Sequence, residues 1–160
     1  MKKTAKLAYI LIVVGLTAAI CSYFNQVGMQ NFYYDLQFPP LVPASIVFPA
    51  VWTLLYALQI VSAFIISLKA DDTELKISNF WFLGQLILQI LWSYAYFYLG
   101  ALGAGVIVIL LLDYNVYKMI RAFAKTDKTA AYLQWPYMFW VLFATYLNIA
   151  FVYYNGTFAF

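Results

Sequence analysis

The stretch Trp135–Asn148, WPYMFWVLFATYLN, contains the side chains best suited to forming a binding surface. Four of them are spaced by three, four and four residues, which places side chains one above another on a helix: Tyr137, Trp140, Ala144 and Asn148. Two aromatic rings, a small side chain and an amide on one stripe could form a wall for a flat apolar ligand. The same stripe could instead be a helix–helix contact inside a bundle.

Two earlier apolar segments carry stripes of the same kind. The first comprises Trp52, Tyr56, Gln59 and Ala63, and the second comprises Gln85, Gln89, Trp92 and Tyr96. Mostly apolar surfaces with a few placed polar groups are typical of small-molecule sites. If these segments pack against the stretch 135–148, their aromatic rings could line a shared pocket.

Asp113 is the most unusual polar residue near the middle of an apolar segment. A carboxyl group at that depth in a membrane is costly and suggests a functional role. It could relay protons or bind a cation, or it could be protonated and hydrogen-bonded to a neighbouring amide or tyrosine. The amides Gln59, Gln89, Asn115 and Asn148 are more typical of contacts between helices.

The composition excludes several kinds of catalytic site. The chain has no histidine and a single cysteine, Cys21, so it lacks His-based triads, His-ligated haem and an internal disulfide. We find no nucleophile–base pair, no glycine loop for phosphate and no metal-ligand constellation in the sequence. Nothing in the residue spacing indicates an enzyme or a required cofactor.

The overall composition indicates a polytopic membrane protein that forms one all-α unit. Of the 160 residues, 66% are hydrophobic and 9% charged, whereas a soluble domain carries about 25% charged residues. Stretches of about twenty apolar residues can cross the hydrocarbon core. They predict spans at residues 7–24, 46–68, 79–99, 104–123 and 136–155. We interpret the first as a retained helix rather than a cleaved signal peptide, because no A-x-A-like site follows it.

The charges predict the orientation of the five spans. All nine Lys and Arg residues lie in the N-terminal tip, around the loop after the second span, or around the loop after the fourth. A five-helix topology brings these segments to one side, which the positive-inside rule makes cytoplasmic. The net charge of +3 is explained by this topology rather than by nucleic-acid binding. The opposite side then holds the loop 25–45, whose aromatics and prolines predict an ordered cap.

Four sequence blocks occur in the order and spacing of a known family. They are YxxLxxPxxxP at residues 33–43, FxxVWxxLY at 48–56, QxxxQxxWSxxYF at 85–97 and PYxxWxxFATxLN at 136–148. Across about residues 7–155 the chain resembles the translocator proteins, also called tryptophan-rich sensory proteins or TspO, which include the peripheral benzodiazepine receptor. In the first loop, Phe38 stands where this family usually has Lys, and Leu41 stands where it has a second Trp.

The resemblance implies a five-helix membrane bundle, often a homodimer, with a ligand pocket closed by the loop 25–45. It implies binding of tetrapyrroles, such as protoporphyrin IX or haem, and of benzodiazepine-like drugs. The residues that we expect to contact the ligand are Tyr33, Trp52, Tyr56, Gln89, Trp92, Ser93, Tyr96, Tyr137, Trp140, Ala144 and Asn148. A bacterial inner membrane, with a cytoplasmic N-terminus, is the expected location.

Three functional hypotheses remain open at this stage. The first is a binding and sensing protein for porphyrin-like ligands, and the second is a transporter of such ligands. A transporter would need alternating access, yet the sequence shows neither internal repeats nor paired broken helices. The third is light- and oxygen-dependent degradation of porphyrin, in which radicals at Trp52 or Trp140 would take part. The absence of the second loop tryptophan, at Leu41, argues against the third hypothesis.

Overall fold

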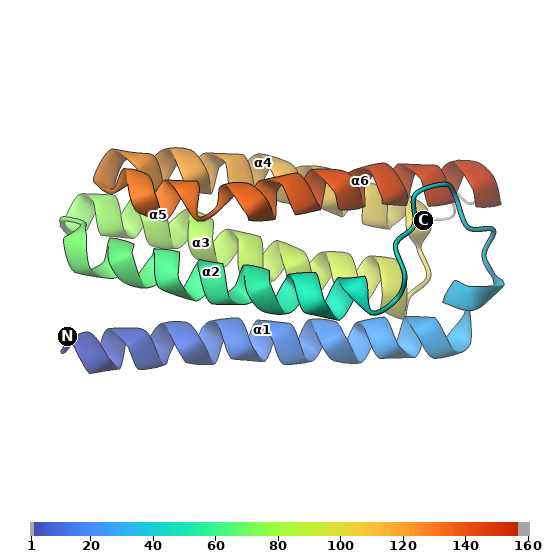
Figure 1. The fold of residues 1–160 in the computed structure, drawn as a ribbon, viewed down its shortest axis with the longest axis horizontal. Coiled ribbons are helices and arrows are strands. Elements are labelled where there is room, and N and C mark those ends of the chain that lie inside the picture. The colour runs from blue at the N-terminus through green and yellow to red at the C-terminus, as the bar shows by residue number, and fades with distance from the viewer. Residues whose placement is uncertain (1, 157–160) are drawn as a thin grey trace.

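The bundle consists of helices that run roughly parallel to one long axis (Figure 1). A computed structural model describes residues 2–156. Its elements are α1 (Lys3–Asn31), a 3-10 turn η1 (Tyr33–Asp35), α2 (Val47–Lys69), α3 (Asp72–Ser93), a π-helical turn η2 (Tyr94–Tyr98), α4 (Leu102–Thr126), α5 (Lys128–Tyr132) and α6 (Trp135–Asn155). Within the described residues, five helical segments are long and apolar enough to cross a membrane, which confirms the predicted all-α fold.

The helix ends follow local capping chemistry and extend several of the predicted spans. Asp71 and Glu74 form a capping box that starts α3 in the charged loop, before residue 79. Asp127 caps α5, since its Oδ1 accepts from the Ala130 amide at 2.8 Å, and this short helix occupies the segment that we expected to be a basic loop. Pro136 stands in the first turn of α6, where its missing N–H leaves no hydrogen bond unmade.

The expected loop 25–45 is shorter than predicted, because α1 continues without a break through Asn31. Asn25 and Gln26 are polar, but neither residue type breaks a helix. Their polarity therefore did not indicate the end of α1. The remaining connection, residues 32–46, runs across the end of the bundle (Figure 1).

Two glycines allow helices to approach the turn η2 closely. At Gly28 of α1, an added Cβ would lie 2.6 Å from the Phe97 carbonyl oxygen and 2.9 Å from its Cα. At Gly105 of α4, an added Cβ would lie 2.8 Å from the Tyr96 ring. Both glycines therefore permit close contact between helices within the chain.

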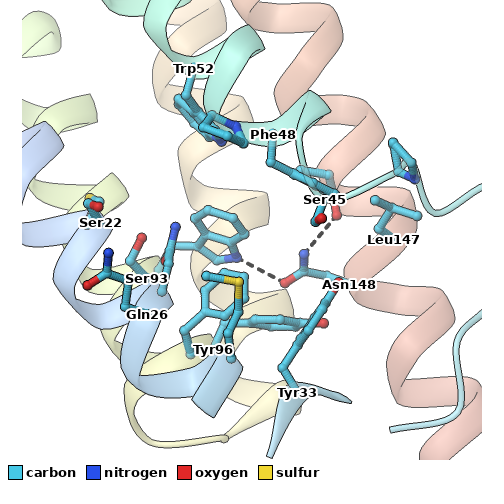
Figure 2. A pocket seen from close by; sticks show the side chains of 18 of the residues that line it. Ser22, Gln26, Tyr33, Ser45, Phe48, Trp52, Ser93, Tyr96, Leu147 and Asn148 are labelled. Carbon is cyan, nitrogen blue, oxygen red and sulfur yellow. Dashed lines mark hydrogen bonds between the residues drawn. The ribbon is translucent and has the colours of Figure 1, made fainter.

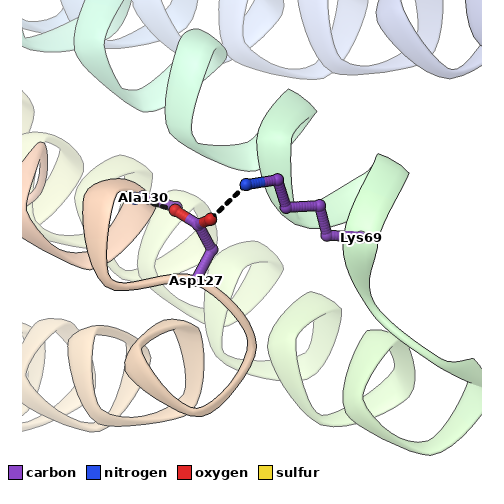
Figure 3. A network of polar contacts seen from close by, with 3 residues as sticks. All are labelled: Lys69, Asp127 and Ala130. Carbon is purple, nitrogen blue, oxygen red and sulfur yellow. Dashed lines mark hydrogen bonds and ion pairs between the residues drawn. The ribbon is translucent and has the colours of Figure 1, made fainter.

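The basic residues gather at the end of the bundle opposite the connection 32–46. An ion pair joins this end, since Lys69 Nζ at the end of α2 lies 2.5 Å from Asp127 Oδ2 before α5 (Figure 3). Lys69 holds the pKa of Asp127 below its ordinary value through this hydrogen bond, with help from the Ala130 amide. Lys6 Nζ of α1 also donates to the Ser67 carbonyl of α2. The ends of α1, α2, α4 and α5 are thus joined by polar contacts at the basic end.

The close approach at Gly28 generates a stability prediction. Gly28→Ala places a methyl group against the Phe97 backbone, which must move away. We expect this overpacking to cost about 1 to 3 kcal/mol and to lower the midpoint of thermal unfolding measured by tryptophan fluorescence.

Gly15→Ala on the same helix is the matched control, because nothing lies within 4 Å of its added Cβ. Alanine is the better helix former by up to about 1 kcal/mol, so this change should leave the midpoint unchanged or raise it. Equal midpoints for the two variants would contradict the close contact between α1 and η2.

Candidate ligand-binding cavity

A cavity of about 880 Å³ lies at the end of the bundle covered by the connection 32–46. Side chains from α1, α2, α3 with η2, α6 and the connection line it (Figure 2). Helix α4 contributes no lining residue. It packs against α3 and α6 instead, so it supports two walls of the cavity from outside. The volume is within the range of about 300 to 1,000 Å³ that small-molecule sites occupy.

Four aromatic rings form a continuous wall along α2, α3 and η2. Successive centroids from Tyr56 through Trp52 and Trp92 to Tyr96 are 5.6, 6.5 and 6.1 Å apart. The angles between neighbouring ring planes are 32°, 33° and 30°. These adjacent rings, each tilted from the next, offer an extended aromatic surface that a planar apolar molecule could contact.

A buried network of amides and phenols fixes the inner end of this wall. Tyr56 Oη donates to Gln89 Oε1 at 3.0 Å. Gln89 Nε2 donates to Gln85 Oε1 at 2.8 Å and to Tyr137 Oη at 2.7 Å, and Tyr137 Oη donates to Gln85 Oε1 at 2.9 Å. Gln85 Nε2 then donates to Gln59 Oε1 at 3.2 Å. The network joins α2, α3 and α6, and its members other than Tyr56 are almost fully buried.

A second hydrogen-bond chain orients the tryptophan at the centre of the wall. Trp92 Nε1 donates to Asn148 Oδ1 at 3.0 Å, and Asn148 Nδ2 donates to the Ala144 carbonyl at 2.8 Å (Figure 2). The indole N–H and the amide are both satisfied in this arrangement. Trp92 therefore presents an oriented ring rather than a free donor to the cavity.

The connection 32–46 is an ordered cap held on α6. The backbone N–H of Gln37 donates to Asn155 Oδ1 at 2.8 Å, and Asn155 Nδ2 donates to the Gln37 carbonyl at 3.0 Å. The rings of Tyr33, Phe38 and Phe151 pack mutually, with centroids 5.3 to 5.5 Å apart. Burial raises the pKa of Tyr33 to about 12, with a smaller contribution from Tyr34, so the phenol is neutral at physiological pH.

Known proteins of one family are similar to this chain. The TspO/MBR family model matches residues 8–154. The chain belongs to the TspO/MBR family. It is 34% identical over 131 residues to a tryptophan-rich protein TspO of Archaeoglobus fulgidus, covering 81% of this chain and 83% of the relative. It is 32% identical over 128 residues to the Chlorobaculum tepidum protein of the same name, covering 79% and 81%, and 32% identical over 120 residues to protein CrtK of Rhodobacter capsulatus, covering 74% of each.

Family membership and the five apolar helices identify a multi-pass membrane protein. The names of the relatives include "tryptophan-rich sensory protein", given to a protein of Cereibacter sphaeroides that is 28% identical over 120 residues, 74% of this chain and 73% of the relative. Together, these findings support a membrane sensory or binding role for this TspO/MBR protein.

The structure brings most of the predicted contact residues of this TspO/MBR protein to one cavity. Its lining includes Tyr33, Trp52, Tyr56, Gln89, Trp92, Ser93, Tyr96, Ala144 and Asn148. Tyr137 and Trp140 are outside the lining. Tyr137 is fully buried in the amide network behind Trp52, and the Trp140 ring packs against Phe48, with a centroid distance of 5.8 Å. The stripe identified the face of α6 that lines the cavity, at Ala144 and Asn148. It did not show that other side chains pack against Tyr137 and Trp140.

The sequence analysis missed the contribution of α1. Ala18, Cys21, Ser22, Asn25, Gln26 and Met29 all line the cavity. Small and polar residues recur at helical spacing on this face of α1, and that pattern could have revealed it. We overlooked it because we ended the first helix at Phe24.

Asp113 lies on α4, which contributes nothing to the cavity lining. Its Oδ2 accepts from Thr145 Oγ1 at 2.8 Å, which joins α4 to α6. Its other oxygen has no partner among the described residues. The carboxyl group therefore makes a contact between helices, and it is not positioned to touch a molecule in the cavity.

The amide network generates a second stability prediction. Tyr137→Phe removes the hydroxyl that accepts from Gln89 and donates to Gln85. The loss of these two hydrogen bonds should cost about 1 kcal/mol, since a hydrogen bond between membrane helices contributes about 0.6 kcal/mol on average, and should lower the midpoint of thermal unfolding. Tyr9→Phe is the control, because Tyr9 is an exposed residue of α1 and should leave the midpoint unchanged. If Tyr137→Phe matched this control, the network would contribute nothing to the packing of α2, α3 and α6.

Proposed function

We propose that this TspO/MBR protein binds a flat, largely apolar ligand within the membrane and signals its occupancy through the cap. The observation that carries the proposal is the wall of four adjacent aromatic rings along a cavity of about 880 Å³. Tetrapyrroles such as protoporphyrin IX or haem, and benzodiazepine-like drugs, are the proposed ligand classes. Both classes offer planar rings that can stack on such a wall.

The cap provides a route from binding to signalling. A ligand on the wall would meet Tyr33 and Phe38, which line the cavity and pack on Phe151. Exchanging these ring contacts for ligand contacts changes the free energy of the capped arrangement. A ligand shifts a conformational equilibrium only by its differential affinity for the two states, and contact with the cap supplies such a difference.

We further propose that the N-terminus is cytoplasmic and that the protein resides in a bacterial inner membrane as a homodimer. The gathering of Lys and Arg at one end of the bundle supports the orientation through the positive-inside rule. The capped cavity would then be near the opposite membrane surface.

The test is a titration with protoporphyrin IX, in the dark, of the protein in lipid nanodiscs, followed by tryptophan quenching. Trp52 and Trp92 line the cavity, so we expect saturable quenching. Ala144→Phe fills part of the cavity from the α6 side and should weaken binding at least about tenfold, since a displaced ring contact is worth more than about 1.4 kcal/mol.

Ala57→Phe is the matched control, because Ala57 lies on α2, is exposed and does not line the cavity. It should bind like the wild type. Non-saturable quenching in the wild type, or equal affinities for the two phenylalanine variants, would contradict the proposed site.

A further inference from the structure

Among the described residues 2–156, the cavity lining contains no charged side chain. Its polar members are hydroxyl, amide and thiol groups, such as those of Ser93, Asn25 and Cys21. Burying a carboxylate without a cationic partner is strongly unfavourable, because protein dipoles replace only part of its hydration. A ligand that carries carboxylates therefore loses hydration in this cavity and gains no ion pair in return.

The charge distribution along the bundle adds to this effect. The N-terminus and the turns α2–α3 and α4–α5 lie at the end of the bundle away from the connection 32–46 (Figure 1). Every Lys and Arg lies in or near one of these three segments: Lys2, Lys3, Lys6, Lys69, Lys76, Lys118, Arg121, Lys125 and Lys128. Among the described residues of the capped end, the acidic or basic side chain is the exposed carboxylate of Asp35 in η1. No cationic side chain there attracts an anion to the mouth.

Phe38 lies at a position in the cap from which a cationic side chain could pair with a ligand carboxylate. Its ring lines the cavity and is 44% exposed, so this position faces both the ligand space and the surface. It packs at 5.3 Å from Tyr33 and 5.5 Å from Phe151, measured between ring centroids. The residue present here extends the apolar surface instead of offering a partner for a carboxylate.

Neutral polar groups on the α1 side offer a different kind of recognition. The Asn25 Oδ1 atom has no hydrogen-bond partner among the described residues, and Asn25 lies beside Ser22 and Gln26 on the lining. Tyr56 already donates its hydroxyl hydrogen to Gln89, so its oxygen remains an acceptor. A ligand hydroxyl or N–H can donate to these two oxygens, and the Ser22 hydroxyl and the Gln26 amide can donate to a ligand carbonyl or ester, without bringing a charge into the cavity.

We propose that the cavity selects uncharged planar ligands, carrying carbonyl, ester or hydroxyl groups, over planar ligands that carry carboxylates. This proposal rests on the proposed function and names the ligand class of the same cavity. It also assigns Phe38 as a specificity-determining residue, because a lysine at that position would supply the missing cation.

The experiment compares protoporphyrin IX dimethyl ester with the free acid in the same dark nanodisc titration at pH 8. The wild type should bind the ester roughly tenfold more tightly. Phe38→Lys should raise the affinity for the free acid roughly twofold to fivefold, the range of a partly exposed ion pair, and should not raise that for the ester. The partitioning of each porphyrin into the lipid is common to both proteins and cancels in the ratio between variants.

Two further variants make the comparison decisive. Phe38→Met removes the ring without adding charge and should give no gain for the free acid. Gln26→Lys adds a cation from exposed α1 lining and should reproduce the gain if Phe38→Lys does not fold. Equal affinities for ester and acid in the wild type, or no gain from either lysine, would overturn the selectivity while leaving the proposed function standing. Failure of both porphyrins to bind the wild type would instead contradict the proposed function.

Discussion

Polar side chains buried away from water need hydrogen-bond partners, and this requirement determines how the helices pack at the centre of the bundle. Gln59, Gln85, Gln89 and Tyr137 are almost fully buried, and an unpaired amide or phenol in such surroundings costs free energy. Their mutual hydrogen bonds satisfy most of these groups only when α2, α3 and α6 stand in one register. Individual hydrogen bonds between membrane helices are modest, at about 0.6 kcal/mol on average, so the network specifies an arrangement more than it stabilises one.

The cavity is the space between these helices on the side of the network that the connection 32–46 covers. Tyr56 and Gln89 belong to both the network and the lining, so the inner boundary of the cavity has a fixed position. Trp92 is oriented from the side by Asn148, and the cap is held by paired hydrogen bonds between Gln37 and Asn155. The walls are helical and the cap is a connection between helices, so the ligand would touch both the bundle and the segment that covers it.

Much of the fold was predictable because its signals are local. Apolar length sets the number of spans, and the positions of Lys and Arg brought the same loops to one end. The cap was also predictable from its aromatics and prolines. The start of α3 and the helix α5 were not, because each depends on an aspartate cap, at Asp71 and Asp127, inside a segment that we interpreted only as charged.

The site was predictable in its faces but not in its depth. The stripes on α2 and α3 identified the ring wall, since helical periodicity fixes which side chains share a face. Periodicity does not show which side chain lies in front, so Tyr137 and Trp140 were placed in the lining although Trp52 and Phe48 lie against them. The role of α1 was missed for a related reason, because polar residues such as Asn25 suggested a loop while they were marking the wall of a cavity.

The single thiol of the chain provides the most direct test of where the ligand lies. Cys21 is buried and lines the cavity beside Ser93 and Tyr56. The measurement is the rate at which methyl methanethiosulfonate modifies Cys21 in nanodiscs, with and without protoporphyrin IX dimethyl ester. If the ligand occupies the cavity, the rate should fall in proportion to the occupancy measured by tryptophan quenching. An unchanged rate at saturating occupancy would place the ligand elsewhere and contradict this account.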